Sequence, residues 1–311
     1  MKNDTIDILL ATYNGFSFIA SQLDSILSQN YKDIRLIIRD DLSNDSTPKV
    51  LEAYVQQYPD IIKILPSDKQ LGVKGNFSCL MENSTSNYIM FADQDDLWEE
   101  GKISKTFAKM KEMEEAYSSV TPLLVHTDLK VVDRDLKVFS ESYWKYGKID
   151  PLKGHSLNRL LMQNVVTGCT MMINRSLLSL SIPVPESAAM HDWWLAIVAA
   201  AFGHIEALPQ TTMMYRQHAR NALGAQKFLS MNYFKKGMER ISRPEFAKQA
   251  HVNALLARYP EKLSPDQRQM LGAYKKLPRA KLLEKAFLIF KYRFFKMGFI
   301  RNVVNILAKK Q

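Results

Sequence analysis

Three carboxylates stand within four residues, directly after a short apolar run. Asp93, Asp95 and Asp96 follow Tyr88–Ala92, and such a cluster repels itself unless a cation offsets its charge. Alternating carboxylates at the end of a buried strand form a hard oxygen site that suits Mg2+ or Mn2+. A metal at that position can hold a diphosphate and take up its charge as it leaves. The competing interpretation is a solvated loop in which one Asp caps a helix.

Two further polar turns follow apolar runs nearer the N-terminus. Thr12-Tyr13-Asn14 follows Ile6–Ala11 and can present backbone groups and a Tyr ring to a nucleobase. Asp40 and Asp41 follow Ile34–Ile38, where a carboxylate can accept from a pyrimidine N–H or a ribose hydroxyl. An ordinary turn explains the first segment equally well. Helix capping by the polar residues that follow explains part of the second segment, but not its adjacent carboxylates.

Gly72, Lys74 and Asn76 belong to a segment that places two glycines around a lysine before a helix-like stretch. Glycine lets the backbone approach a nucleotide closely, and Lys74 is suited to face a phosphate. The segment is not a Walker A loop, because the Gly-rich spacing and the Lys-Ser/Thr pair are missing. A plain loop is the alternative.

Met190–Trp194 places Asp192 between a histidine and two tryptophans at the start of a helix-like stretch. Partial desolvation can raise the pKa of such a carboxyl until it serves as a general base. The faces of Trp193 and Trp194 are suited to stack on a sugar ring. The alternative is an Asp helix cap with the indoles in the core.

Arg216 and His218 alternate after a strand-like run. This spacing suits one or both of them to a diphosphate or a metal. The alternative is a polar loop that leaves the sheet.

Apolar runs alternate with helix-like patterns over the first 220 residues. Short strands alternating with helices predict an α/β domain on a mainly parallel sheet, in which ligands bind at the carboxyl ends of the strands. The polar turns after the first, second and fourth apolar runs fall at such ends. The expected strands are Ile6–Ala11, Ile34–Ile38, Ile61–Leu65, Tyr88–Ala92, Leu123–Val132, Val165–Ile173, His204–Leu208 and Thr211–Arg216, and the expected helices are Phe16–Gln29, Ser46–Tyr58, Lys102–Ala116 and Met190–Phe202.

The composition, 46% hydrophobic and 24% charged, is that of an ordinary globular protein, and 311 residues suggest about two domains. Cys79 and Cys169 lie far apart and give neither a disulfide framework nor a zinc spacing, so we expect a reducing compartment. The N-terminal residues lack the apolar core of a signal peptide. No uncharged apolar run approaches the roughly 20 residues of a membrane span.

The net charge of +10 is unevenly distributed. Residues 1–226 hold 22 Lys and Arg against 27 Asp and Glu, whereas residues 227–311 hold 20 against 5. The basic tail predicts an anionic partner, either a membrane surface or nucleic acid. We expect one domain over residues 1–225 and a basic helical region over 226–311. Within it, Lys281–Lys310 suits either a basic amphipathic helix on an anionic leaflet or a packed helical domain with a basic outer face.

Together and in this order, the motifs resemble those of the family 2 glycosyltransferases with a GT-A fold, over about residues 4–221. The matching segments are Thr12-Tyr13-Asn14, Asp40–Thr47, Asp93–Asp96 and His191-Asp192. Finer features look like the bacterial rhamnosyltransferase branch, whose members build O-antigens or cell-wall polysaccharides. These features are Phe91–Trp98, Val166–Met172, Met190–Trp194 and Tyr215–His218.

The resemblance implies a Rossmann-like α/β domain and an inverting transfer of one sugar from a nucleotide-sugar to an acceptor hydroxyl. Asp192 would be the catalytic base, and Trp193 and Trp194 would contact the acceptor. Asp93, Asp95 and His218 would hold Mg2+ or Mn2+. Together with the residue types discussed above, it implies donor contacts from the following residues: Thr12, Tyr13, Asn14, Asp40, Asp41, Gly72, Lys74, Asn76, Asp93, Gln94 and Arg216.

The branch implies dTDP-L-rhamnose as the donor, with a UDP-sugar as the alternative, and a lipid-linked glycan as the acceptor. We therefore expect a cytoplasmic protein that is peripheral at the inner face of the cytoplasmic membrane. His191 departs from the family, which commonly has a Glu beside the catalytic Asp. The Gln-x-x-Arg-Trp motif of processive synthases is missing, so a polymerase is not expected.

Two rival functions fit fewer residues. A nucleotidyltransferase would carry a Gly-rich N-terminal loop with a basic triphosphate signature, which Ile6–Phe16 lacks. Nucleic-acid binding would suit the basic tail and would show a steep salt dependence. Asp93–Asp96 is a poor surface for a phosphate backbone, and no nucleic-acid motif is evident, so we expect no nucleic-acid partner.

Overall fold

The structure is a computed structural model that describes residues 4–218 and 244–307 of the chain. Within these ranges nine strands form one mixed sheet in the order β3-β2-β1-β4-β8-β6-β9-β5, with β7 beside β6. The strands are β1 (Ile6–Thr12), β2 (Ile34–Asp40), β3 (Ile62–Ile64), β4 (Tyr88–Asp93), β5 (Leu97–Trp98), β6 (Leu123–Val132), β7 (Val138–Ser140), β8 (Met171–Asn174) and β9 (His204–Arg216).

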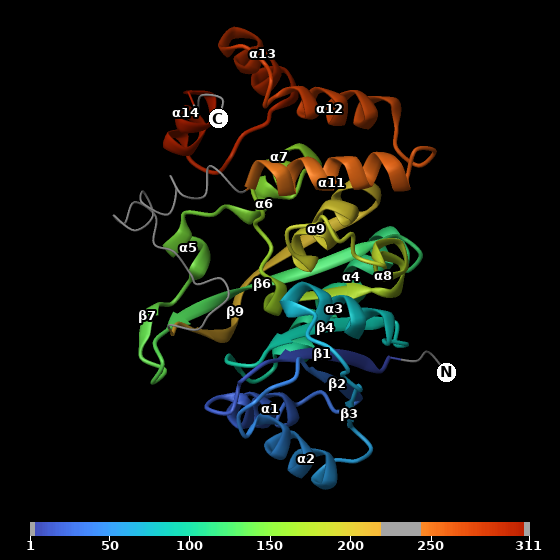
Figure 1. Cartoon of the computed structure of the whole chain (residues 1–311), viewed down its shortest axis with the longest axis vertical. Helices are drawn as coiled ribbons and strands as arrows, with labels where there is room; N and C mark the ends of the chain where they lie inside the picture. The colour runs from blue at the N-terminus through green and yellow to red at the C-terminus, as the bar shows by residue number, and fades with distance from the viewer. Residues whose placement is uncertain (1–3, 219–243, 308–311) are drawn as a thin grey trace.

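Helices pack on both faces of this sheet (Figure 1). They are α1 (Ile19–Leu27), α2 (Thr47–Gln57), α3 (Gly72–Glu82), α4 (Lys102–Tyr117), α5 (Tyr143–Gly147), α6 (Pro151–Gly154), α7 (Leu157–Met162), α8 (Arg175–Ser181) and α9 (His191–Phe202), with a 3-10 turn at Gly168–Thr170. In α2, Pro48 stands in the first turn, where its missing N–H leaves no helical hydrogen bond unmade.

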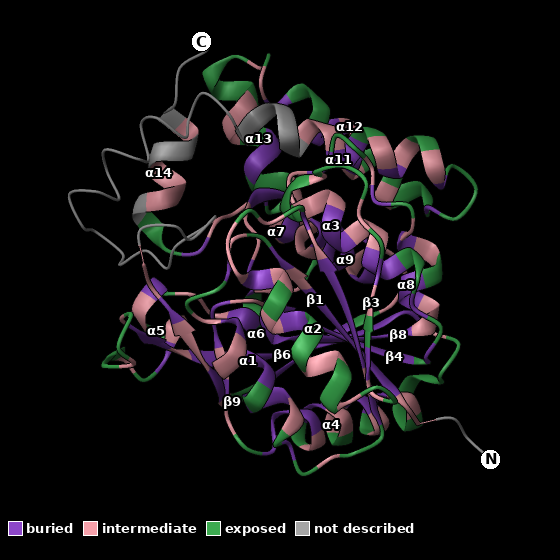
Figure 2. Cartoon of the chain, turned by 60° about the horizontal axis from the view of Figure 1, so that its bottom comes forward, coloured by how far each residue is buried: buried purple, intermediate pink, exposed green. Residues whose placement is uncertain are grey.

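Strands β1, β2, β3 and β4 are parallel, and their residues alternate between two hydrophobic cores. Leu9 and Ile37 face the core formed with α3, α7, α8 and α9. Ile8 and Leu36 face the core formed with α1, α2 and α4. Because both faces are covered, these strands are continuous apolar runs rather than alternating ones. Figure 2 shows the buried strands inside a layer of helices whose outer faces are exposed.

The register of the parallel strands brings three polar ends together. Thr12 pairs with Asp40, and Ala11 pairs with Asp93. The carboxyl ends of β1, β2 and β4 therefore lie side by side at one edge of the sheet, where ligands bind in open α/β sheets.

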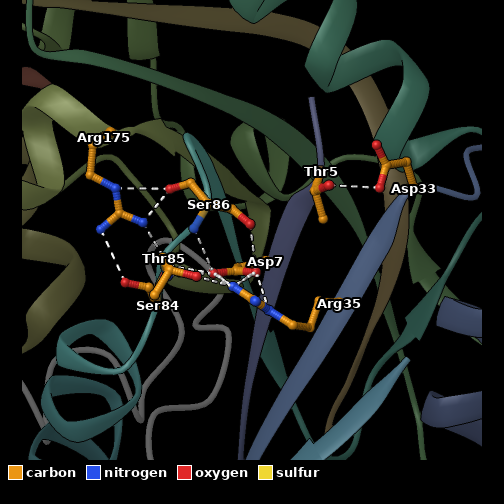
Figure 3. A network of polar contacts seen from close by, with 8 residues as sticks. All are labelled: Thr5, Asp7, Asp33, Arg35, Ser84, Thr85, Ser86 and Arg175. Carbon is orange, nitrogen blue, oxygen red and sulfur yellow. Dashed lines mark hydrogen bonds and ion pairs between the residues drawn. The ribbon is translucent and has the colours of Figure 1, made fainter. Parts of the chain in front are cut away.

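A buried carboxylate, Asp7, connects the amino-terminal ends of the same strands (Figure 3). Asp7 on β1 accepts from Arg35 Nε on β2 at 2.9 Å and from the hydroxyls of Ser84 and Ser86 at 2.7 Å each. Burial by itself raises the pKa of Asp7, but these donors outweigh it and lower the pKa below its usual value. The network ties β1 and β2 to the segment that leads into β4.

Four local predictions were wrong. Residues 165–167 are not a strand, because a turn closed by Thr170 N–H to Thr167 O precedes β8. The segment around Lys74 is not a loop, since α3 already begins at Gly72. The two strand-like pieces 204–208 and 211–216 are one strand, β9, with an irregular register against β6. Over the described residues 281–307 the tail is not one helix, because Arg293 adopts a left-handed conformation and ends the first of two.

The C-terminal helices are α11 (Pro244–Arg258), α12 (Pro265–Lys276), α13 (Leu282–Tyr292) and α14 (Phe299–Leu307). Val252, Leu271 and Ile289 belong to the same hydrophobic core as α7 and α9. The hydroxyl of Tyr274 also donates to Leu161 O at 2.9 Å. These helices therefore pack against the sheet domain. The predicted boundary at residue 225 lies outside the described residues, and none of the described helices is both long and apolar enough to cross a membrane.

Candidate active site

The turn after β1 is held by a side chain from the end of β4. Gln94 Oε1 accepts from Thr12 Oγ1 at 2.6 Å and from Tyr13 N–H at 2.8 Å, and its Nε2 donates to Tyr13 O at 3.1 Å. A Cβ atom on Gly15 would lie 2.3 Å from Gln94 Oε1, so this approach requires glycine. The Tyr13 ring stays 46% exposed. Gln94 therefore positions the turn and leaves the Tyr13 ring available for stacking.

The loop after β2 is joined to the same turn. Asn14 N–H donates to Ser43 Oγ at 2.8 Å, and Asn14 Oδ1 accepts from Asn44 N–H at 2.9 Å. Asp40 accepts from Ser43 N–H at 2.8 Å and also from the Ser43 hydroxyl. Half-buried Asp40 therefore lies at the edge that the register predicts, next to the Tyr13 turn.

Asp41 and Asn76 are buried and make structural contacts inside the protein, and their contact with the donor stays a prediction. Asp41 is buried and accepts from Arg39 Nη1 at 2.8 Å and from the N–H groups of Leu71 and Gly72 at 2.8 and 2.9 Å. Asn76 Oδ1 accepts from the same guanidinium at 2.5 Å. Asp41 thereby caps α3 and neutralises a buried arginine. The N–H of Gly72 is likewise used inside the protein.

Lys74 makes hydrogen bonds to the segment before α9. Its Nζ donates to the carbonyl oxygens of Glu186 and, at 3.0 Å, Ala188, which precede α9. A lysine held by two carbonyls there braces the segment leading to Asp192. The contact of Lys74 with a phosphate stays a prediction.

The acidic residues after β4 separate into two environments. Asp95 Oδ2 lies 2.8 Å from His218 Nε2. Ligand atoms of Asp93, Asp96 and Cys169 lie within 4.8 Å of one another. Burial, together with the charges of Asp95 and Asp192, raises the pKa of Asp93 to about 7. Burial and the charges of Asp95 and Asp93 raise the pKa of fully buried Asp96 well above its usual range.

Some of these side chains are suitable ligands for a hard divalent cation, and others are not. Asp93 and Asp95 offer carboxylate oxygens, and His218 offers an imidazole nitrogen, all of which suit Mg2+ or Mn2+. The thiol of Cys169 is a soft ligand that does not suit either ion. Asp96 is fully buried and accepts from Arg216 N–H at 3.2 Å, so it joins the loop after β4 to the end of β9.

An aromatic residue that sequence reasoning missed supports this side of the site. The Phe18 ring stacks on His218 with centroids 4.8 Å apart, and the Arg216 guanidinium lies 4.9 Å from the Phe18 centroid. Arg216 is buried and donates from Nε to Asp95 O at 2.8 Å. Arg216 therefore positions the acidic loop. A single Phe before a helix gives no sequence signal for this contact.

Asp192 lies in the first turn of α9, where the helix dipole favours a negative charge. Its carboxylate accepts from Asn164 Nδ2 at 3.2 Å and from Trp193 N–H at 2.6 Å. Burial raises the pKa of Asp192 to about 6, against the opposing effect of these donors and of the Gly168 N–H. Asn164 and Gly168 were not predicted, because neither lies near Asp192 in the sequence. A carboxyl with this pKa is ionised at neutral pH and basic enough to accept a proton.

The two tryptophans beside Asp192 differ. Trp194 is fully buried, and its Nε1 donates to Ser181 O at 2.9 Å, so the predicted contact with an acceptor is wrong. Trp193 is half-buried, with Nε1 donating to Leu160 O at 2.7 Å. His191 is buried and stacks on Phe77 with centroids 4.1 Å apart. The start of α9 is thus anchored in the core while Asp192 remains partly accessible.

Residues 7–179 match the sequence model of glycosyl transferase family 2, which is more than half of the chain. The chain belongs to this family. It is 31% identical over 245 residues to the dTDP-rhamnosyl transferase RfbG of Shigella flexneri, covering 74% of this chain and 79% of that protein. The family 2 chain is therefore a glycosyltransferase, as its motifs predicted.

Solved structures confirm the predicted α/β fold of the GT-A type. S. aureus TarS 1-349 in complex with UDP-GlcNAc superposes with a TM-score of 0.58 at 16% identity, covering 93% of this family 2 chain and 85% of TarS. The mannosyltransferase PcManGT from Pyrobaculum calidifontis, in complex with GDP-Man and Mn2+, gives 0.51 at 15% identity, covering 98% and 88%. At these identities the likeness concerns the fold alone.

Proposed function

We propose that this enzyme transfers one L-rhamnose from dTDP-L-rhamnose, with inversion, to a hydroxyl of a lipid-linked glycan during synthesis of a bacterial surface polysaccharide. The 31% identity to a dTDP-rhamnosyl transferase supports the donor. The UDP-GlcNAc bound by the structural neighbour TarS makes a UDP-sugar the alternative donor.

The environment of Asp192 is the observation that carries the proposed chemistry. The acceptor hydroxyl oxygen attacks the anomeric carbon while the bond to the diphosphate breaks on the opposite face, which inverts the configuration. Asp192 takes the hydroxyl proton, and its pKa of about 6 matches this task near neutral pH. Donation from Asn164 holds the carboxylate in place. Trp193, half-buried beside it, is the proposed acceptor contact.

Donor binding is assigned to the edge formed by β1, β2 and β4. Tyr13 would stack on the base, and Asp40 would accept from the base or the ribose. Thr12, Asn14 and Gln94 would keep the Tyr13 turn in the conformation described above. A turn preorganised in this way lowers the entropic cost of binding the nucleotide.

Asp93, Asp95 and His218 would hold a divalent cation, Mg2+ or Mn2+. When bound, such an ion neutralises negative charge on a leaving diphosphate. The Mn2+ in PcManGT supports this assignment. Arg216, through Asp95 O, would keep the acidic loop in register with the donor edge.

The proposed acceptor carries a lipid, so we place the enzyme in the cytoplasm, at the inner face of the cytoplasmic membrane. The proposed function needs no nucleic-acid partner.

Calorimetric binding of dTDP-L-rhamnose, UDP-glucose, UDP-galactose and GDP-mannose, each with Mg2+, with Mn2+ and with EDTA, tests the donor and the cation together. We expect cation-dependent binding with preference for dTDP-L-rhamnose. Preference for a UDP-sugar would refute the rhamnose assignment and keep the enzyme class. Equal binding in EDTA would refute the cation assignment.

A further inference from the structure

Helix α13 turns an apolar face to the solvent. Leu283, Phe287 and Phe290, spaced i, i+4 and i+7, lie on one side of the helix and are 85%, 62% and 64% exposed. Leu288 and Ile289, on the other side, are buried in the core shared with α7 and α9. The helix is therefore anchored, and its packing holds the three large side chains outward.

Isolated exposed apolar residues are normal on a protein surface, but a contiguous patch marks an interaction site. Leu282, next to Leu283 in the same helix, is also 55% exposed. In Figure 1 α13 lies at the end of the molecule opposite α1 and α2. We call Leu282, Leu283, Phe287 and Phe290 the α13 patch.

The surroundings of the α13 patch are strongly cationic. Residues 275–301 contain nine Lys and Arg and one acidic residue, Glu284. Lys281, Lys291 and Arg293 are exposed on α13 and at its ends. Lys291 Nζ lies 5.8 Å from the centroid of the Phe287 ring, so positive charge directly adjoins the apolar face. An apolar face rimmed by Lys and Arg is complementary to an anionic lipid surface.

We propose that the α13 patch inserts into the headgroup region of an anionic phospholipid bilayer, with Lys281, Lys291 and Arg293 at the lipid phosphates. A second copy of the chain fits this surface less well. Two-fold pairing would place the same cationic rim against itself. This proposal rests on the proposed function, because the proposed acceptor is linked to a lipid. Attachment would keep the enzyme at the membrane surface that holds this acceptor.

Vesicle flotation of the full chain tests the proposal. We expect binding to phosphatidylglycerol-containing vesicles, weak binding to pure phosphatidylcholine, and release at about 1 M salt, where the Debye length falls to roughly 3 Å. The variant Leu283→Ser/Phe287→Ser/Phe290→Ser should bind at least about tenfold less, because binding follows buried apolar area. The matched control Val120→Ser/Phe139→Ser/Leu152→Ser changes three residues that are 79%, 59% and 74% exposed elsewhere, and should bind like the wild type.

A charge variant provides a second test that spares the packing of α13. Lys281→Glu/Lys291→Glu/Arg293→Glu changes only exposed side chains and should also lose binding to the anionic vesicles. Thermal melting confirms that each variant folds. Equal flotation of the wild type and both patch variants would overturn the proposal. A dimer that the serine variant abolishes, without any flotation of the wild type, would assign the patch to a second copy instead.

Donor calorimetry on the same samples separates the two proposals. A patch variant that no longer floats with vesicles but binds the donor normally would support the role of the α13 patch and leave the proposed function unchanged. Normal flotation of a wild type that binds no nucleotide-sugar would count against the proposed function and leave the membrane surface standing.

Discussion

The imidazole of His218 lies 2.8 Å from the carboxylate of Asp95, although 123 positions separate the two residues in the chain. The contact joins the segment after β9 to the loop after β4 and places an imidazole nitrogen beside one carboxylate of the acidic loop. The Phe18 ring stacked on His218 keeps the imidazole in this place. Each of these contacts bears on a measurable property.

Asp95→Asn and His218→Ala should each weaken Mn2+-dependent donor binding at least about tenfold, since each removes one ligand of the proposed cation. Donor calorimetry with Mn2+ and with EDTA measures the effect. The matched controls Asp60→Asn and His204→Ala change exposed residues and should bind as the wild type does. A wild-type Mn2+ dependence in Asp95→Asn would contradict the cation site.

Asp192→Asn should lower kcat by at least about 100-fold and leave donor affinity unchanged, because the amide cannot accept the acceptor proton. Release of nucleoside diphosphate measures turnover, and calorimetry measures donor affinity. Asp192→Asn with near-normal turnover would show that another group is the base.

Between pH 5 and 7, kcat/KM should rise with pH around a midpoint of about 6, the pKa of Asp192, because only the ionised carboxylate accepts a proton. Asn164 donates to that carboxylate and lowers its pKa, so Asn164→Ala should move the midpoint to higher pH. The pH profile of each enzyme gives the midpoint. An Asn164→Ala variant with reduced rate and an unmoved midpoint would show that Asn164 does not stabilise the ionised form.

Asp41→Ala should lower the free energy of unfolding by about 3 kcal/mol, because it leaves the buried Arg39 guanidinium without its counter-charge and uncaps α3. Urea denaturation measures the change. Asp68→Ala, an exposed carboxylate nearby in the sequence, should alter stability by no more than about 0.5 kcal/mol. Equal stability of the two variants would contradict the structural role of Asp41.

Gly15→Ala should weaken donor binding about tenfold, because the added Cβ displaces Gln94 and with it the Tyr13 turn. In the background Gln94→Ala, where the clash is gone, the further effect of Gly15→Ala should be much smaller. Gly272→Ala serves as the control, since a Cβ there meets no atom within 4 Å. Additive effects of Gly15→Ala and Gln94→Ala would refute the positioning role of Gln94.

The strands of the sheet, and the edge at which their polar ends meet, are predictable from the amino-acid pattern. Runs such as Ile8–Leu10 and Leu36–Ile38 are apolar on both faces, and only a sheet covered on both sides buries such runs fully. Parallel strands end at a common edge, so the polar residues after each run had to meet there. The order of the motifs was enough to predict the family and the general place of Asp40, Asp93 and Asp192.

The roles of adjacent residues of the same type depend on how the chain folds. Asp40 lies at the carboxyl edge of the sheet while Asp41 pairs with Arg39, and Trp193 stays partly accessible while Trp194 lies in the core. Asn164 had no signal at all, because its contact with Asp192 joins segments 28 residues apart. Local patterns predict which faces are buried. Which polar atoms meet depends on the packing of distant segments, and each buried polar group needs a partner that the packing supplies.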